Sequence, residues 1–241
     1  YLFILIGISC SAELKAQKNG TVYKGNDPAV RYTGRTLVSS DGSVAFDWVG
    51  TYLETRFTGG KLSVKVSETG TSYYNVFVDG KLHKVVKVCG TDTLIHLVSG
   101  IDKRIHSLKI QKRSEGEFGK TTVHQFVLSG SGRLAEELAV RTRHIEFIGN
   151  SLTCGYGTDG KHRDEPFLVE TENCNLTFAS MVARYYDADY TLIAHSGRGA
   201  ARNYGDSVRV SKVTMKDRML NTFDEDLTHK WNFKEYRPDL V

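Results

Sequence analysis

Residues 143–157 decide the architecture of the second half of the chain, and they read Arg-His-Ile-Glu-Phe-Ile-Gly-Asn-Ser-Leu-Thr-Cys-Gly-Tyr-Gly. A short apolar strand at residues 145–148 leads directly into a Gly-Asn-Ser turn. Open α/β sheets bind ligands at the carboxyl ends of their strands, so this order predicts that Ser151 presents its hydroxyl at such an edge. Backbone N–H groups beside that hydroxyl suit a developing oxyanion. Thr153 occupies the position of the second glycine in the α/β-hydrolase elbow, which argues against that fold.

The composition is that of an ordinary globular protein. The chain has 241 residues, of which 40% are hydrophobic and 25% charged. This length is enough for one large or two ordinary domains. The net charge of +4 is spread out, and no basic run alternates with aromatic residues. We therefore expect no nucleic-acid partner.

The N-terminus is apolar from Tyr1 to Ser9. This run is too short to cross a bilayer, so no stable membrane insertion is expected. It is typical of the core of a secretory signal peptide within residues 1–16, cleaved after Ala12 or Ala16. A lipoprotein with Cys10 lipidated is the second interpretation, and a buried strand ranks below both. The sequence thus predicts a secreted or periplasmic protein, with a surface lipoprotein as the alternative.

Three cysteines remain after such processing, namely Cys89, Cys154 and Cys174. They are too few for a disulfide framework, although Cys154 and Cys174 could form one pair. No spacing resembles a zinc site, so no metal is expected. Cys154 is a poorer nucleophile candidate than Ser151, because free cysteines are usually small buried hydrophobes.

Residues 17–138 have the pattern of an all-β domain. Apolar residues alternate with polar ones at Leu62, Val64 and Val66, as in a half-buried strand. Asp79-Gly80 predicts a hairpin turn, and the strand that follows is expected to end at Cys89-Gly90. Short strands with regular turns predict a β-sandwich.

Residues 139–241 change to a strand, helix, strand order. Leu176, Met181, Val182 and Tyr185 have helical spacing, with Asn175 as the expected N-cap. Residues 190–194 form a second apolar strand, and residues 238–241 resemble the start of a third. The sequence predicts the first part of a parallel, flavodoxin-like α/β domain.

The stretch at residues 145–157 resembles the first signature of the SGNH (GDSL-type) hydrolases. Its sequence is most similar to that of the family 2 carbohydrate esterases. This chain departs from the family at Asn150, where Asp is usual. Residues 32–35, 46–51 and 57–60 resemble the N-terminal jelly-roll module of the same family. Trp48 and Tyr52 fit core packing better than a sugar-stacking platform.

The resemblance assigns roles to two loops. Ser151 would be the catalytic nucleophile, and its backbone N–H would contribute to the oxyanion hole. Residues 194–204 resemble the block that supplies a second oxyanion donor, for which Gly199 is our choice and Gly197 the alternative. Arg198 and Arg202 fit solvated turn charges better than sugar contacts.

The later SGNH blocks are not found. The family's Gly-x-Asn-Asp block is absent, and its Asp-x-x-His block has only two formal matches, which end at His162 and His229. Both matches precede the third strand, so no base is assigned, although His229 remains an outside candidate. The acidic residues of the loop after Ser151 predict a solvated segment; they are Asp159, Asp164, Glu165, Glu170 and Glu172.

These observations predict a secreted carbohydrate esterase that removes O-acetyl groups from plant polysaccharides such as xylan, with no cofactor. The expected partner is the acetylated polysaccharide, and no oligomeric state is indicated. The chain is expected to be incomplete and inactive as an esterase by itself, with the catalytic His and oxyanion Asn beyond Val241. The alternative is a non-catalytic carbohydrate-binding protein with a vestigial hydrolase half.

Overall fold

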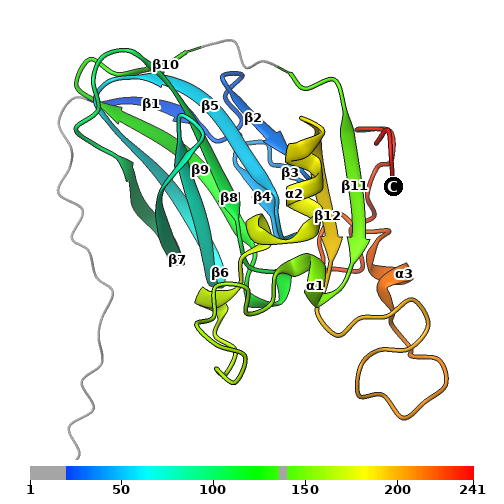
Figure 1. Cartoon of the computed structure of the whole chain (residues 1–241). Coiled ribbons are helices and arrows are strands. Elements are labelled where there is room, and N and C mark those ends of the chain that lie inside the picture. The colour runs from blue at the N-terminus through cyan, green and yellow to red at the C-terminus, as the bar shows by residue number, and fades with distance from the viewer. Residues whose placement is uncertain (1–19, 136–139) are drawn as a thin grey trace, which may run out of the picture.

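The computed structural model describes residues 20–135 and 140–241. The expected signal peptide and Cys10 therefore lie outside the described residues. Residues 20–135 form a large antiparallel sheet, and the residues from 140 onward form a smaller α/β part packed beside it (Figure 1). In the described residues, no helix is long and apolar enough to cross a membrane.

The large sheet consists of β1 (Gly20–Lys24), β2 (Val30–Thr33), β3 (Leu37–Val38), β4 (Val44–Phe46), β5 (Tyr52–Thr58), β6 (Lys61–Val78), β7 (Lys81–Val98), β8 (Ile105–Lys112), β9 (Thr121–Ser129) and β10 (Arg133–Ala135). The smaller part contains β11 (His144–Gly149), α1 (Ser151–Cys154), α2 (Phe178–Tyr185), β12 (Asp189–Ala194) and α3 (Met215–Arg218). Short 3₁₀ helices occur at η1 (Gly116–Phe118), η2 (Val169–Thr171) and η3 (Cys174–Leu176).

The ten strands form one curled, jelly-roll-like sheet rather than the separate sheets of the predicted sandwich (Figure 1). Its order is β10-β5-β8-β6-β9-β4-β3, while β1 pairs with β9, β2 with β5 and β7 with β6. The long strand β6 explains the continuity. Its first half pairs with β9 and its second half with β8, so the strand bends from one layer into the other.

The hairpin between β6 and β7 confirms the turn predicted at Asp79-Gly80, because both residues have positive φ, 50° and 75°. The expectation that β7 ends at Cys89-Gly90 is wrong, since the strand continues to Val98. Gly90 and Asp92 adopt left-handed conformations near a shift of register with β6. The glycine therefore marks a bulge rather than a strand end.

The concave side of the curled sheet holds the main core. The predicted alternation is confirmed, because Leu62, Val64 and Val66 all point into this core. They pack with side chains from β4, β5, β8 and β9, including Phe46, Phe57, Ile110 and Phe126. Trp48 and Tyr52 are also fully buried, as expected for core residues.

In the smaller part, β11 and β12 pair in parallel, with Ile145 opposite Tyr190. Leu240 forms a parallel bridge to Ile145 on the other side of β11, which agrees with the predicted third strand. Helix α2 begins one residue after Thr177, so the predicted N-cap at Asn175 is wrong. Asn175 instead lies within η3, whose own cap is the side chain of Asn173.

The two parts share a continuous interior. Gly50 precedes β5 with φ of 75°, and a Cβ added there would lie 2.6 Å from Cδ1 of Leu192 in β12. The rings of Tyr52 and Tyr190 are 5.3 Å apart. The Tyr52 hydroxyl donates a 2.7 Å hydrogen bond to Asp189. The curled sheet thus forms one wall of the core that supports β12.

We predict that Gly50→Ala destabilises the protein by about 2–4 kcal/mol, because it combines positive φ with a clash against Leu192. Gly80→Ala is the matched control. Gly80 has the same φ of 75° and no atom within 4 Å of an added Cβ, so this variant should lose only about 1 kcal/mol. Urea denaturation followed by tryptophan fluorescence measures both losses. Equal losses would show that Leu192 moves aside without cost.

Candidate active site

Ser151 lies where the sequence predicted, directly after β11 and at the first position of α1. Asn150 is extended, and its side-chain oxygen accepts a 3.1 Å hydrogen bond from the N–H of Leu152. A Cβ on Gly149 would lie 2.0 Å from Oγ1 of Thr153. Only glycine therefore allows the chain to turn this sharply from the strand into the helix.

The loop after β12 meets Ser151 because the two parallel strands end at the same level. Gly149 of β11 is opposite Ala194 of β12. A pocket of about 610 Å³ opens there, and its lining includes Ser151, Gly197 and Gly199. The structure thus brings together the candidate nucleophile and the two oxyanion donor candidates.

The conformation of this loop depends on its glycines. Gly197 has φ of 73°, and a Cβ on Gly199 would lie 2.1 Å from the carbonyl oxygen of Arg202. The Gly199 N–H donates a 3.3 Å hydrogen bond to the side-chain oxygen of Asn203. That distance is at the long end of the usual range, so the N–H is only weakly engaged.

Charged and aromatic side chains complete the lining. Arg198 and Arg202, expected as solvated turn charges, both line the pocket, as do Tyr156 and Tyr204. Tyr204 is 93% exposed. Tyr156 is held by a stacked contact with Phe167, whose ring centroid is 3.7 Å away. Sequence reasoning missed this aromatic pair, although both residues lie in the loop that follows Ser151.

His195 is the first residue after β12 and is 1% exposed. Its Nδ1 lies 2.7 Å from Oδ2 of Asp224, and its Nε2 lies 3.5 Å from Oε2 of Glu117. Burial lowers the pKa of His195, but the hydrogen bonds to Asp224 and Glu117 outweigh that effect and raise the pKa to about 9. The imidazole is therefore protonated at neutral pH and cannot accept a proton from Ser151.

Asp224 is itself held from two sides. Arg218 donates a 2.8 Å hydrogen bond to its Oδ1. The backbone N–H groups of Asp224 and Glu225 donate to the carboxylate of Asp47, which follows β4. Burial and the neighbouring charge of Asp224 raise the pKa of Asp47 to about 7. The sequence did not reveal this network, because its members are far apart along the chain.

The other histidines lie away from Ser151. His229 is exposed, with Nδ1 2.6 Å from Asp226, and His162 is also exposed. His144 stacks on Tyr236 and lies 2.7 Å from the hydroxyl of Thr191. Within residues 20–135 and 140–241, no histidine is in the pocket lining. This geometry therefore does not support His229, the less favoured candidate, as the base.

Two expectations about the flanking segments are corrected. Cys154 and Cys174 are both free, so the suggested pair does not form. Their Sγ atoms instead contact Glu115 and the carbonyl of Lys112. The loop after Ser151 is not uniformly solvated, because Glu172 is fully buried. Sequence periodicity could not show this, since the atoms that cover Glu172 come from residues near the end of β8.

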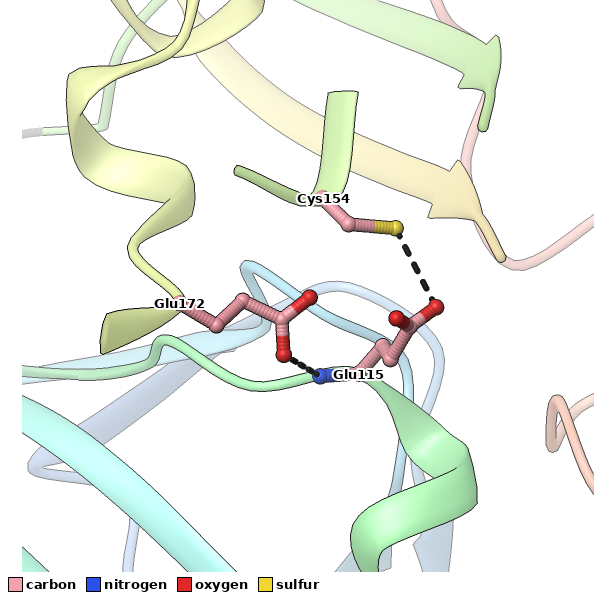
Figure 2. Close-up of side chains that lie close together, drawn as sticks. All are labelled: Glu115, Cys154 and Glu172. Carbon is pink, nitrogen blue, oxygen red and sulfur yellow. Dashed lines mark hydrogen bonds between the residues drawn. The ribbon is translucent and has the colours of Figure 1, made fainter. Parts of the chain in front are cut away.

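Among the residues that the structure describes, two groups of side chains have the spacing to hold a cation. His195, Asp224 and Glu225 form the first. The guanidinium of Arg218 already bonds both of its carboxylates, at 2.8 and 2.7 Å, and supplies the compensating positive charge. The second group comprises Glu115, Cys154 and Glu172, whose side chains lie close together (Figure 2) and which are outside the pocket lining.

Comparison with known proteins agrees with this geometry. Residues 32–137 match the family described as Carbohydrate esterase 2 N-terminal. The Cellulase/esterase CelE of Acetivibrio thermocellus is 32% identical over 90% of this chain and 26% of its own length. An Acetylxylan esterase / glucomannan deacetylase of Cellvibrio japonicus is 31% identical over 86% of this chain and 58% of its own length. The chain thus spans only part of each relative.

Comparison with solved structures also identifies carbohydrate esterases as similar proteins. A family two carbohydrate esterase from Clostridium thermocellum, in complex with cellohexaose, superposes with a TM-score of 0.82. It is 31% identical and is matched over 88% of this chain and 64% of that chain. The relatives and the solved structure are carbohydrate esterases, so the chain is similar to proteins of that class. More particularly, residues 32–137 match the carbohydrate esterase 2 N-terminal family, and the chain as a whole resembles the family 2 carbohydrate esterases.

We predict that the His195 imidazole titrates with a pKa of about 9 in the folded protein. Because this value lies above the ordinary 6.5, the protonated ring stabilises the fold fully below pH 6.5, and this stabilisation is lost as the pH rises through about 9. Two-dimensional ¹H–¹⁵N spectra of the imidazole nitrogens measure the titration. Exposed His229 in the same spectra serves as the internal control. A pKa for His195 near 6.5 would contradict the described contacts with Asp224 and Glu117.

Proposed function

We propose that the protein carrying this chain is a secreted, serine-dependent carbohydrate esterase of the SGNH type, which removes O-acetyl groups from plant polysaccharides such as xylan. The observation that carries the proposal is the position of Ser151. It lies at the end of β11, in the same pocket as the glycine loop after β12. The Cellvibrio relative is an acetylxylan esterase / glucomannan deacetylase, which supports the substrate class. The apolar N-terminal run supports secretion.

In the proposed reaction, Oγ of Ser151 attacks the acetyl carbonyl, and a base accepts the hydroxyl proton. The tetrahedral intermediate collapses to an acetyl-enzyme and releases the sugar hydroxyl. Water then attacks the acetyl-enzyme and releases acetate, which regenerates Ser151. No redox step or cofactor enters this sequence.

The N–H of Ser151 is suited to the oxyanion because the first N–H groups of a helix have no partner within it. Gly199 is the proposed second donor, and its 3.3 Å hydrogen bond to Asn203 is weak enough to be exchanged for the oxyanion. The described residues bring no neutral histidine to Ser151. We therefore propose that the complete protein supplies the base and an oxyanion Asn from outside residues 1–241.

A non-catalytic carbohydrate-binding protein is the second candidate. Its support is the open pocket with the exposed ring of Tyr204, because exposed aromatic rings beside polar groups suit sugar binding. The related Clostridium esterase has been solved in complex with cellohexaose. A measurement of acetate release distinguishes the two candidates. A carbohydrate-binding protein would bind the polysaccharide but would release no acetate from it.

We predict that Ser151→Ala, in the protein with its full natural sequence, lowers acetate release from acetylated xylan by about 10³-fold or more. The reason is that no other group can form the acetyl-enzyme. Ser207→Ala is the control, because Ser207 is exposed and outside the pocket lining. Activity that survives Ser151→Ala would reject the nucleophile. Absence of activity in the unmodified protein, with retained polysaccharide binding, would favour the second candidate.

We also predict that Tyr204→Ala weakens binding of xylo-oligosaccharides by roughly two- to ten-fold, the range expected for loss of one ring contact. Tyr185→Ala is the matched control, because Tyr185 is 83% exposed but lies on α2, outside the pocket lining. Isothermal titration calorimetry on the catalytically silent Ser151→Ala background measures the affinities. If the two substitutions change the affinity equally, Tyr204 is not part of the binding surface.

A further inference from the structure

Glu115 belongs to the curled-sheet part but extends its side chain under the α/β part (Figure 2). It follows β8 by three residues and precedes η1. The residue is 0% exposed, and it is not part of the pocket lining. A carboxylate is expensive to bury without partners, so its hydrogen bonds indicate what it does there.

One carboxylate oxygen of Glu115 accepts hydrogen bonds from two segments, the helix α1 and the loop that follows β12. Oε2 accepts a 2.6 Å hydrogen bond from the N–H of Ser196. The same oxygen accepts a 3.4 Å contact from the thiol of Cys154, shown as a dashed line in Figure 2. Cys154 is the last residue of α1, the helix that Ser151 begins. Ser196 directly precedes Gly197 in the loop that carries Gly199.

Glu172 completes the arrangement from the other side. Its Oε2 accepts a 3.0 Å hydrogen bond from the backbone N–H of Glu115 (Figure 2). Burial, and then the neighbouring carboxylate of Glu115, raise the pKa of Glu172 to about 9. Glu172 therefore holds its proton more tightly than an ordinary carboxyl group does.

The hydrogen bond from Ser196 is the stronger of the two contacts to Oε2 of Glu115. Its 2.6 Å length is short for an N–H donor, and hydrogen bonds to carboxylates are shorter and about twice as strong as neutral ones. The buried side chain of Lys112 donates a 3.4 Å hydrogen bond to the backbone carbonyl oxygen of Glu115. Glu115 therefore links α1 to the loop that follows β12.

We propose that Glu115 is a positioning residue of the esterase, which fixes the distance between Ser151 and the Gly197–Gly199 loop, with Glu172 as its hydrogen-bond partner. This inference rests on the proposed function of Ser151. Neither carboxyl group contacts the substrate in this arrangement. Glu115 acts on the reaction through Cys154 and Ser196, because these contacts keep the proposed nucleophile and the proposed oxyanion donors at a fixed distance from each other.

The test compares Glu115→Gln with Glu172→Gln in the protein with its full natural sequence. Glu172→Gln keeps a side-chain oxygen that can accept the hydrogen bond from the Glu115 N–H. It should leave kcat for p-nitrophenyl acetate and acetylated xylan within about two-fold at pH 7. Glu115→Gln replaces the carboxylate that accepts from Ser196 and Cys154 by an amide, whose oxygen is a weaker acceptor. It should lower kcat by roughly ten- to hundred-fold, because small misplacements of reacting groups have effects of that size. KM should change by less than about three-fold, because the pocket lining is intact.

A merely structural role predicts another pattern, in which both variants lose stability and kcat falls together with a rise in KM. That pattern, or equal kcat values for the two variants, overturns the proposal. Zinc bound stoichiometrically to the purified protein also overturns it, because Glu115, Cys154 and Glu172 would then be metal ligands. Cys154→Ala, which leaves the Ser196 bond in place, should lower kcat less than Glu115→Gln.

Hydrogen exchange measured by mass spectrometry provides a readout that does not depend on esterase activity. Glu115→Gln should speed exchange in peptides that cover residues 151–155 and 195–199, while peptides from β6 and β9 keep their protection. If Ser151→Ala retains activity but this exchange pattern appears, the proposed nucleophile fails and the anchoring by Glu115 stands. Unchanged exchange in both peptides rejects the anchoring, whatever the activity of Ser151.

Discussion

The parallel pairing of β11 with β12 is the constraint on which the site depends. Because Gly149 is opposite Ala194, both strands end at the same level, and the segments that follow them leave the sheet side by side. Ser151 and the glycine loop meet in one pocket only because of this register. A shift of one residue would turn every side chain of β12 to the opposite face and would move His195 out of its contact with Asp224.

The curled sheet contributes to the site as well as to the support of β12. Tyr52 donates a hydrogen bond to Asp189 at the start of β12, and Arg31 and Arg141 both bond the same carboxylate. Burial would raise the pKa of Asp189, but these partners outweigh it and lower the pKa. At the other end of β12, Glu115 accepts a hydrogen bond from the backbone of Ser196, and Asp47 accepts from the backbone of Asp224, the partner of His195. Because residues of the curled-sheet part bond the segments at both ends of β12, the boundary between the two parts is a shared polar and apolar interior.

Local pattern was sufficient to predict the elements that build the site. Apolar runs predicted β11 and β12, glycines predicted the turns, and their order along the chain predicted that Ser151 and Gly199 would meet. Long-range polar partners could not be read from the chain in the same way. His195 and Asp224 are 29 residues apart, and Glu115 and Glu172 are 57 residues apart. Burial of a carboxylate leaves no local pattern in the sequence, so Glu172 was assigned to a solvated loop.

Two predictions about the sheet, the end of β7 at Gly90 and the two separate sheets, were wrong for a related reason. Gly90 is a turn signal in most contexts, yet here it allows a bulge within a strand of 18 residues. The alternation that identified β6 continues on both sides of its bend, so it indicated buried faces correctly. It could not distinguish two stacked sheets from one sheet that folds over itself. That distinction depends on which strands β6 pairs with along its length, and pairing is a long-range property.

The protonation of His195 determines what this half of the site can do. A buried, protonated imidazole supplies positive charge near the pocket but has no free position for a proton. Arg198 and Arg202 add two further positive charges to the lining, and Glu117 is its one carboxylate. A pocket of this polarity suits the proposed reaction, because acyl transfer to a serine develops negative charge on the substrate. In that proposal, activation of Ser151 requires a base with an ordinary or lowered pKa, a property that His195 lacks because of its hydrogen bonds to Asp224 and Glu117.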